Sequence, residues 1–165
     1  SDGALPDVVS LLLNSWPDAI KEKDCHDKTP LHLACTYGAS FEIISFLLES
    51  WPNAIREKDL RDRTPLHLAC AHGASLDVIT LLMASWPDLI KEKNCHEETP
   101  LHVACRYDAS LELIHLLLKS WPDAVHEIDN EDETPLHAAC RWNASLEIVS
   151  LLIGSWPDAT KKTKL

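Results

Sequence analysis

The stretch Thr29-Pro30-Leu31-His32 decides the fold, because the same four residues return three more times along the chain. The later copies begin at Thr64, Thr99 and Thr134, so each copy starts 35 residues after the previous one. A constant period of this length predicts an array of stacked units. Each unit is too small to bury its own apolar face, so its neighbours must complete its core.

Two other sequences recur with the same period. One is Ala-Cys, with Cys35, Cys70, Cys105 and Cys140; the other is Ser-Trp-Pro, with Trp16, Trp51, Trp86, Trp121 and Trp156. We expect the cysteines to lie on the buried side of a helix, where cysteine acts as a small hydrophobic residue. We expect the tryptophans to pack over helix ends rather than to stack on nucleic-acid bases.

The first helix of each unit starts at the recurring Thr-Pro. Thr29 can cap a helix with its hydroxyl, and Pro30 suits the first helical position, where a missing N–H costs nothing. This predicts a helix from Pro30 to about Tyr37. The helix should stop at residues that tolerate left-handed backbone, which are Gly38, Gly73, Asp108 and Asn143 in the successive units.

A second helix follows almost at once. Its predicted N-caps are Ser40, Ser75, Ser110 and Ser145. Pro52 and its equivalents prevent continuation, so this helix should end near Ser50-Trp51. The polar stretch from Lys21 to Lys28, and its counterparts, should form an extended hairpin-like loop. The predicted fold class is therefore all-α, with short β-hairpin-like loops.

The stretch from Asp24 to Cys35, Asp-Cys-His-Asp-Lys-Thr-Pro-Leu-His-Leu-Ala-Cys, resembles the opening of an ankyrin repeat. Glu42-Ile43-Ile44 and Leu47-Leu48 continue the resemblance, which covers residues 7 to about 159. It implies a helical-hairpin solenoid. The period exceeds the family's usual length of about 33 residues, and the extra two residues fall in the Ser-Trp-Pro-Asp-Ala-Ile segment. The family's hairpin glycine is replaced by Asp27, Asp62, Glu97 and Asp132.

These periods divide the chain into one continuous repeat domain. We expect a partial repeat with only a second helix over residues 1–23, repeat 1 over 24–58, repeat 2 over 59–93, repeat 3 over 94–128, and repeat 4 with a C-terminal tail over 129–165. Apolar residues near the start, including Leu5, Val8 and Leu12, lack a polar cap. An uncapped apolar end of this kind could support a homodimer.

Composition restricts the classes of partner. The chain has 165 residues, of which 45% are hydrophobic and 25% charged, as in ordinary soluble domains. A formal net charge of −11 opposes nucleic-acid binding. No apolar run reaches the length of about 18 residues needed to cross a membrane, and no signal peptide is evident. We therefore expect a cytoplasmic protein with no membrane or nucleic-acid partner.

Nine histidines and six cysteines raise the question of a metal site or an active site. The resemblance implies that His32, His67, His102 and His137 are internal hydrogen-bonding struts. Cys25-His26 and Cys95-His96 lie two repeats apart, roughly 20 Å at ordinary helix spacing, too far to share one zinc ion. We predict no metal, no cofactor and no catalytic residue, and hence no enzyme. A metal protein or enzyme that uses Cys25, His26, Cys95 and His96 is a separate hypothesis.

Function is expected where the repeats differ. The resemblance implies that the ends of the first helices face a concave groove, and these ends are Thr36-Tyr37, Ala71-His72, Arg106-Tyr107 and Arg141-Trp142. It also implies contact fingers at the loop tips, which carry Cys25, His26 and Lys28; Leu60, Arg61 and Arg63; Cys95, His96 and Glu98; Asn130, Glu131 and Glu133. Aromatic residues beside arginines are typical of interface hot spots.

We therefore predict a non-enzymatic scaffold that binds a protein or peptide through this groove and the loop tips. The alternative is a structural spacer or self-assembling repeat unit without a dedicated partner. Arg106 and Arg141 have two possible roles. They can pair in place with Glu98 and Glu133, or they can stay free and select a partner segment that carries a carboxylate.

Overall fold

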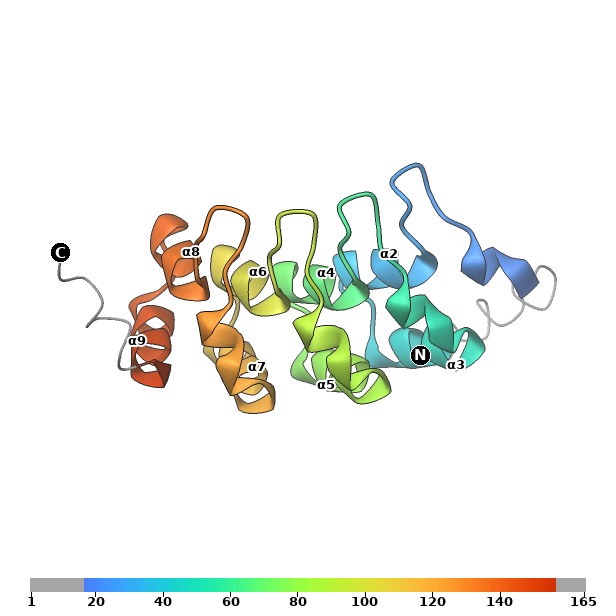
Figure 1. Ribbon diagram of the computed structural model, residues 1–165. Coiled ribbons are helices and arrows are strands. Elements are labelled where there is room, and N and C mark those ends of the chain that lie inside the picture. The colour runs from blue at the N-terminus through green and yellow to red at the C-terminus, as the bar shows by residue number, and fades with distance from the viewer. Residues whose placement is uncertain (1–16, 157–165) are drawn as a thin grey trace.

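The structure, a computed structural model, describes residues 17–156 (Figure 1). Over this range the chain is helical and contains no β-strand. The first helices of the repeats are α2 (Pro30–Thr36), α4 (Pro65–Ala71), α6 (Pro100–Arg106) and α8 (Pro135–Arg141). The second helices are α3 (Phe41–Ser50), α5 (Leu76–Ser85), α7 (Leu111–Ser120) and α9 (Leu146–Ser155). The predicted apolar N-terminal end, Trp16 and the C-terminal tail lie outside the described residues.

The helices form two rows, and the loops form a third row along one edge (Figure 1). Each first helix packs against the first helix of the next repeat, from α2 to α4, α4 to α6 and α6 to α8. Each second helix packs against the first helix of its own repeat. The predicted all-helical solenoid is therefore confirmed.

The helix boundaries follow the local chemistry that the sequence predicts. Thr29, in extended backbone, caps α2 and Pro30 occupies its first turn. The four predicted stop residues all adopt positive φ: Gly38 66°, Gly73 67°, Asp108 49° and Asn143 57°. The predicted serine caps precede all four second helices, and Ser75 and Ser110 accept hydrogen bonds from Val78 and Leu113 backbone N–H groups.

A short 3₁₀ helix, which the sequence analysis missed, begins at the proline of each of the first four Ser-Trp-Pro sequences. These are η1 (Pro17–Lys21), η2 (Pro52–Arg56), η3 (Pro87–Lys91) and η4 (Pro122–His126). In η2 the Ala54 N–H donates to the Trp51 carbonyl at 3.0 Å, and both Ala54 and Ile55 are buried. The two extra residues per repeat thus belong to a segment that adds apolar side chains to the core.

The tryptophans pack as predicted where the structure describes them. Trp51, Trp86, Trp121 and Trp156 are half-buried against the core. The guanidinium of Arg56 stacks over the Trp86 ring at 4.6 Å, and His126 meets Trp156 edge-on at 4.6 Å. Residues of one 3₁₀ helix therefore cover the tryptophan of the next repeat.

Two predictions of burial fail in repeat 4. Cys35, Cys70 and Cys105 are buried, but Cys140 is exposed. Likewise His32, His67 and His102 are fully buried, whereas His137 is exposed. The reason is that burial of these positions depends on the following repeat, and within residues 17–156 no repeat follows α8 and α9.

Candidate functional site

The predicted site residues gather on one surface, which we call the loop-tip face. It comprises loop residues 25–28, 60–63, 95–98 and 130–133 together with helix ends 36–37, 71–72, 106–107 and 141–142. Loop and helix end meet directly, because Arg106 reaches Glu98 at 2.7 Å and Arg141 reaches Glu131 at 2.7 Å. The sequence positions that vary between repeats are thus close in space.

The residue just before each loop tip holds the loop in place through its side chain. The sequence analysis missed this recurring aspartate or asparagine. Asp59 Oδ1 accepts hydrogen bonds from the backbone N–H groups of Arg61, at 2.9 Å, and Arg63, at 3.0 Å. The same pair of bonds recurs at Asp24, Asn94 and Asp129. Burial acts to raise the pKa of Asp59, but the hydrogen bonds from Arg63 and Arg61 outweigh it and leave that pKa lowered.

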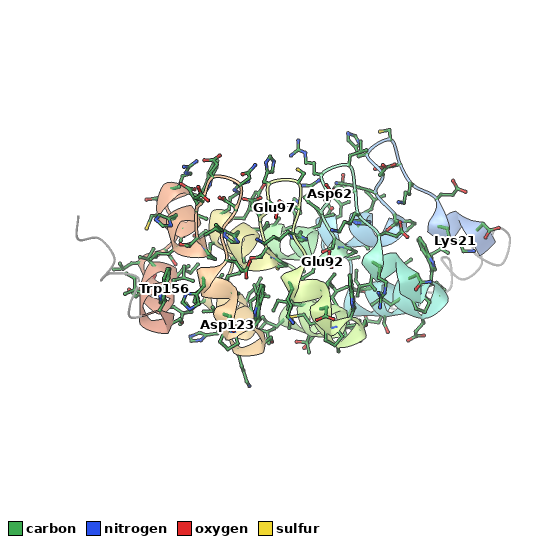
Figure 2. The ribbon with its side chains drawn as sticks, in the orientation of Figure 1. Lys21, Asp62, Glu92, Glu97, Asp123 and Trp156 are labelled. Carbon is green, nitrogen blue, oxygen red and sulfur yellow. The ribbon has the colours of Figure 1, made fainter. Side chains whose placement is uncertain are left out.

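The tip of each loop turns through a left-handed residue. Asp27, Asp62, Glu97 and Asp132 have φ between 55° and 58°. Figure 2 shows Asp62 and Glu97 on two neighbouring loops of the row. Backbone bonds join these tips: Leu60 N–H donates to the His26 carbonyl at 3.0 Å, and Cys95 N–H donates to that of Arg61 at 2.9 Å. The tips therefore form one continuous, positioned row.

The recurring histidines tie the loops to the helices. The Thr64 N–H donates to His67 Nδ1 at 3.2 Å, and His67 Nε2 lies 3.1 Å from the Glu98 carbonyl of the next repeat. Because a carbonyl only accepts, Nε2 carries the proton and Nδ1 is the acceptor. Burial lowers the pKa of His67 to about 4, so the ring is neutral at pH 7. The predicted strut role is seen in His32, His67 and His102, which each reach the next repeat.

A second set of links, also missed by the sequence analysis, joins successive repeats through charged side chains. Lys23 pairs with Glu57 at 2.7 Å, Lys58 with Glu92 at 2.9 Å and Lys93 with Glu127 at 3.1 Å. These lysines and glutamates recur with the period of the repeat, and this recurrence could have predicted the pairs from the sequence. Partly exposed pairs of this kind contribute at most about 1 kcal/mol each, so they orient the loops more than they stabilise the fold.

Three aromatic side chains project from the ends of the first helices. Tyr37 is 81% exposed, Tyr107 55% and Trp142 52%. They occupy the same position in their repeats, immediately after α2, α6 and α8, and His72 takes that position after α4. Such exposure means that Tyr37 covers little of its own helix end.

The two arginines of this face are paired in place. Arg106 Nη2 lies 2.7 Å from Glu98 Oε1, and its guanidinium stacks over the Trp142 ring at 5.0 Å. Arg141 pairs with both Glu131 and Glu133. Of the two roles that the sequence left open, the structure shows pairing within the chain.

The family model described as "Ankyrin repeats (3 copies)" matches residues 1–91 and 75–163. The chain belongs to the ankyrin repeat family. No curated protein matches it. Ankyrin repeats are generally protein–protein interaction modules and are typically non-enzymatic. Among residues 17–156, no helix combines the length and the apolar character that crossing a bilayer requires.

Most of the ankyrin contact positions proposed from the sequence are accessible. Exposed residues are Cys25, His26, Tyr37, Leu60, Arg61, His72, Cys95, His96, Tyr107, Asn130, Glu131, Arg141 and Trp142; half-buried ones are Lys28, Thr36, Arg63, Ala71, Arg106 and Glu133. Glu98 is the exception. It is only 2% exposed, because Asn94 and Arg106 hold its carboxylate against the loop. Its predicted accessibility to a partner is wrong.

The two Cys-His pairs of the loop tips, Cys25-His26 and Cys95-His96, do not combine into one metal-binding cluster among residues 17–156. Cys25 Sγ lies 3.2 Å from the Nδ1 atom of its neighbour His26. In the part of the chain that the structure describes, no cluster of three or more histidine, cysteine, aspartate or glutamate residues could hold a metal ion. These exposed pairs therefore add polar contact groups to the loop-tip face.

Proposed function

We propose that this chain is a non-enzymatic scaffold that binds a protein or peptide partner through the loop-tip face. The observation that carries the proposal is the row of exposed aromatic residues at one repeated position, Tyr37, Tyr107 and Trp142. Large rigid side chains are the commonest energetic anchors of protein interfaces. Here a regular backbone holds them out at successive positions, beside loop tips that hydrogen bonds keep in place.

Family membership supports the same proposal, since ankyrin repeats generally mediate protein–protein interactions. The formal charge of −11 argues against a phosphate backbone as the partner. A protein or peptide segment fits the surface better, because a repeated row of aromatic groups and paired charges offers both apolar contacts and hydrogen bonds along its length.

The test is an alanine variant of all three aromatic residues, Y37A/Y107A/W142A, used as bait in affinity capture followed by mass spectrometry. We expect each partner captured by the parent chain to bind at least about tenfold more weakly to the variant. The matched control is F41A/L146A, which removes exposed apolar side chains from the second helices instead. Circular dichroism confirms that both variants remain helical.

Capture that both variants retain equally would contradict the proposal and favour the alternative, a structural spacer or self-assembling unit. That alternative has one observation in its support: Leu146, in the last described repeat, is 76% exposed. Light scattering over a range of protein concentrations tests self-assembly directly, because a homodimer would show a mass that rises with concentration.

A further inference from the structure

A small pocket opens on the loop-tip face between the loops of repeats 2 and 3. It has a volume of about 50 Å³, and its lining includes Arg61 and Arg63 from one loop, Glu98 from the next, and Ala71, Arg106 and Tyr107 from the helix ends. Ala71 occupies the position where the other repeats carry Thr36, Arg106 and Arg141. We call it the Ala71 pocket, after the smallest side chain in this lining.

The Ala71 pocket is locally cationic in an acidic chain. Three arginines line it against one carboxylate, that of Glu98. Arg63 is neutralised by Asp59, whose Oδ2 it meets at 2.7 Å and 2.9 Å. Glu98 is already taken by Arg106. Arg61 is exposed and makes no ion pair within residues 17–156, so one guanidinium at the pocket is left without a counter-charge.

A second unused group lies in the same lining. Arg106 Nε is buried and has no hydrogen-bond partner among the described residues. Buried donors of this kind are rare in folded proteins and call for an explanation. Burial is the main cause of the lowered pKa of the neighbouring His72, and the positive charges of Lys28 and Arg63 lower it further. Both observations favour an anionic group as the occupant.

We infer that the Ala71 pocket binds the side-chain carboxylate of an aspartate or glutamate in the partner polypeptide, an inference that rests on the proposed function. The size agrees: one water-sized group needs about 10–15 Å³, so the pocket accommodates roughly the methylene and carboxylate of one acidic side chain. Arg61 supplies the counter-charge and Arg106 the unused N–H. Tyr107, on the rim, packs against the partner beside its acidic residue.

The experiment titrates the whole chain, in 150 mM salt, with N-acetyl-glutamate N-methylamide and with its neutral analogue N-acetyl-glutamine N-methylamide. The arginine Nε–H resonances in ¹H–¹⁵N NMR spectra are the readout. We expect the Arg61 and Arg106 signals to shift saturably with the carboxylate and not with the amide. The Arg56 signal, from an exposed arginine on η2 outside the pocket, should not move.

Two variants and one matched control sharpen the test. A71R fills the pocket with the residue that repeats 3 and 4 carry at this position, and it should abolish the shifts. R61Q should weaken binding by about tenfold. R56Q, which removes the same charge elsewhere, should leave binding unchanged. Equal shifts with carboxylate and amide, equal shifts at Arg56 and Arg61, or full binding by A71R would each overturn the inference.

Failure of this inference is distinguishable from failure of the proposed function. If A71R captures every partner as strongly as the parent chain while Y37A/Y107A/W142A does not, the loop-tip face is a binding surface and the Ala71 pocket is not part of it. If the carboxylate probe binds but the aromatic variant loses no partner, the pocket is real and the proposed function is wrong.

Discussion

Repeat 2 and repeat 4 contain the same motif, Thr-Pro-Leu-His followed by Ala-Cys, in two different environments. In repeat 2, Leu66, His67 and Cys70 are all buried. In repeat 4, Leu136 is half-buried, and His137 and Cys140 are exposed. The helices themselves are alike, with seven residues each in α4 and α8. The motif therefore determines the local backbone, while the following repeat determines burial.

The comparison also separates two kinds of hydrogen bond. Both His67 and His137 accept from the N-cap threonine of their own helix through Nδ1. Only His67 continues through Nε2 to the carbonyl of the next loop. Local capping thus survives at the end of the described array, and the link between repeats does not.

Cysteine reactivity should show the largest contrast. Burial raises the pKa of the Cys105 thiol to about 12 from its usual value of 9.0, so at neutral pH its thiolate fraction falls by about a thousandfold. A brief pulse of N-ethylmaleimide, read by peptide mass mapping, should modify the exposed Cys140 many times faster than Cys105, because the reagent reaches only an exposed thiol. Labelling in urea provides the control, in which the two should react alike. Equal labelling rates of Cys140 and Cys105 in the native chain would contradict the difference in burial between the repeats.

Truncation of one buried leucine should give the second-largest difference between repeat 2 and repeat 4. Leu66→Ala removes a fully buried side chain and should lower the free energy of unfolding by about 2–5 kcal/mol. The same change at the half-buried Leu136 should cost less than about 2 kcal/mol, because solvent already reaches this position. Urea denaturation monitored by circular dichroism measures both. A larger loss at Leu136 would contradict the dependence on a following repeat.

The pH dependence of stability should distinguish the two histidines. The pKa of His67 is lowered by burial to about 4 from an ordinary 6.5. Between these values the unfolded chain binds more protons, so the free energy of unfolding falls as pH decreases from about 6.5 to 4, by about 3 kcal/mol for this group. His67→Gln should remove part of that slope, and His137→Gln is the matched substitution at the exposed position of repeat 4. Urea midpoints at pH 7.5 and pH 5 test this, and an unchanged slope in His67→Gln would be the contrary result.

Backbone strain at the loop tips should give the smallest effect, and one that does not depend on a neighbour. Glu97 has φ 58° and Asp132 has the same value. Left-handed backbone costs a glutamate more than an aspartate. Glu97→Gly should therefore raise the free energy of unfolding by up to about 1 kcal/mol, and Asp132→Gly by less. Thermal unfolding provides the measurement. Destabilisation by Glu97→Gly would show that its side chain contributes more than the strain costs.

Sequence reasoning succeeded where a residue's role is local. Thr29, Pro30 and Ser75 act through their own backbone neighbours, and Gly38 and Asn143 tolerate the positive φ that ends their helices, so residue type at a fixed period was sufficient. It failed for Cys140 and His137, because their burial depends on a unit that is absent from the described residues. A comparison of the repeats reveals the periodic pattern but not how far another repeat covers each position.

At the candidate site, prediction from the sequence was limited by other features of the structure. The variable positions and the aromatic row could be read from the differences between repeats. The sequence named both roles of Arg106 but could not decide between them, because the choice depends on how Asn94 and Arg106 together hold Glu98 under the loop. The Ala71 pocket was equally hidden, since residues from the loops and first helices of two repeats line it together. Such features are properties of three-dimensional packing across repeats.

The histidine struts and the lysine–glutamate pairs have a mechanical consequence. Each reaches only from one repeat to the next, with His67 bonded to Glu98 and Lys58 paired with Glu92. Tension applied to the two ends of the array is then resisted by one junction at a time rather than by the whole molecule. Pulling should extend the chain in steps of one repeat, each releasing about 120 Å of polypeptide for its 35 residues.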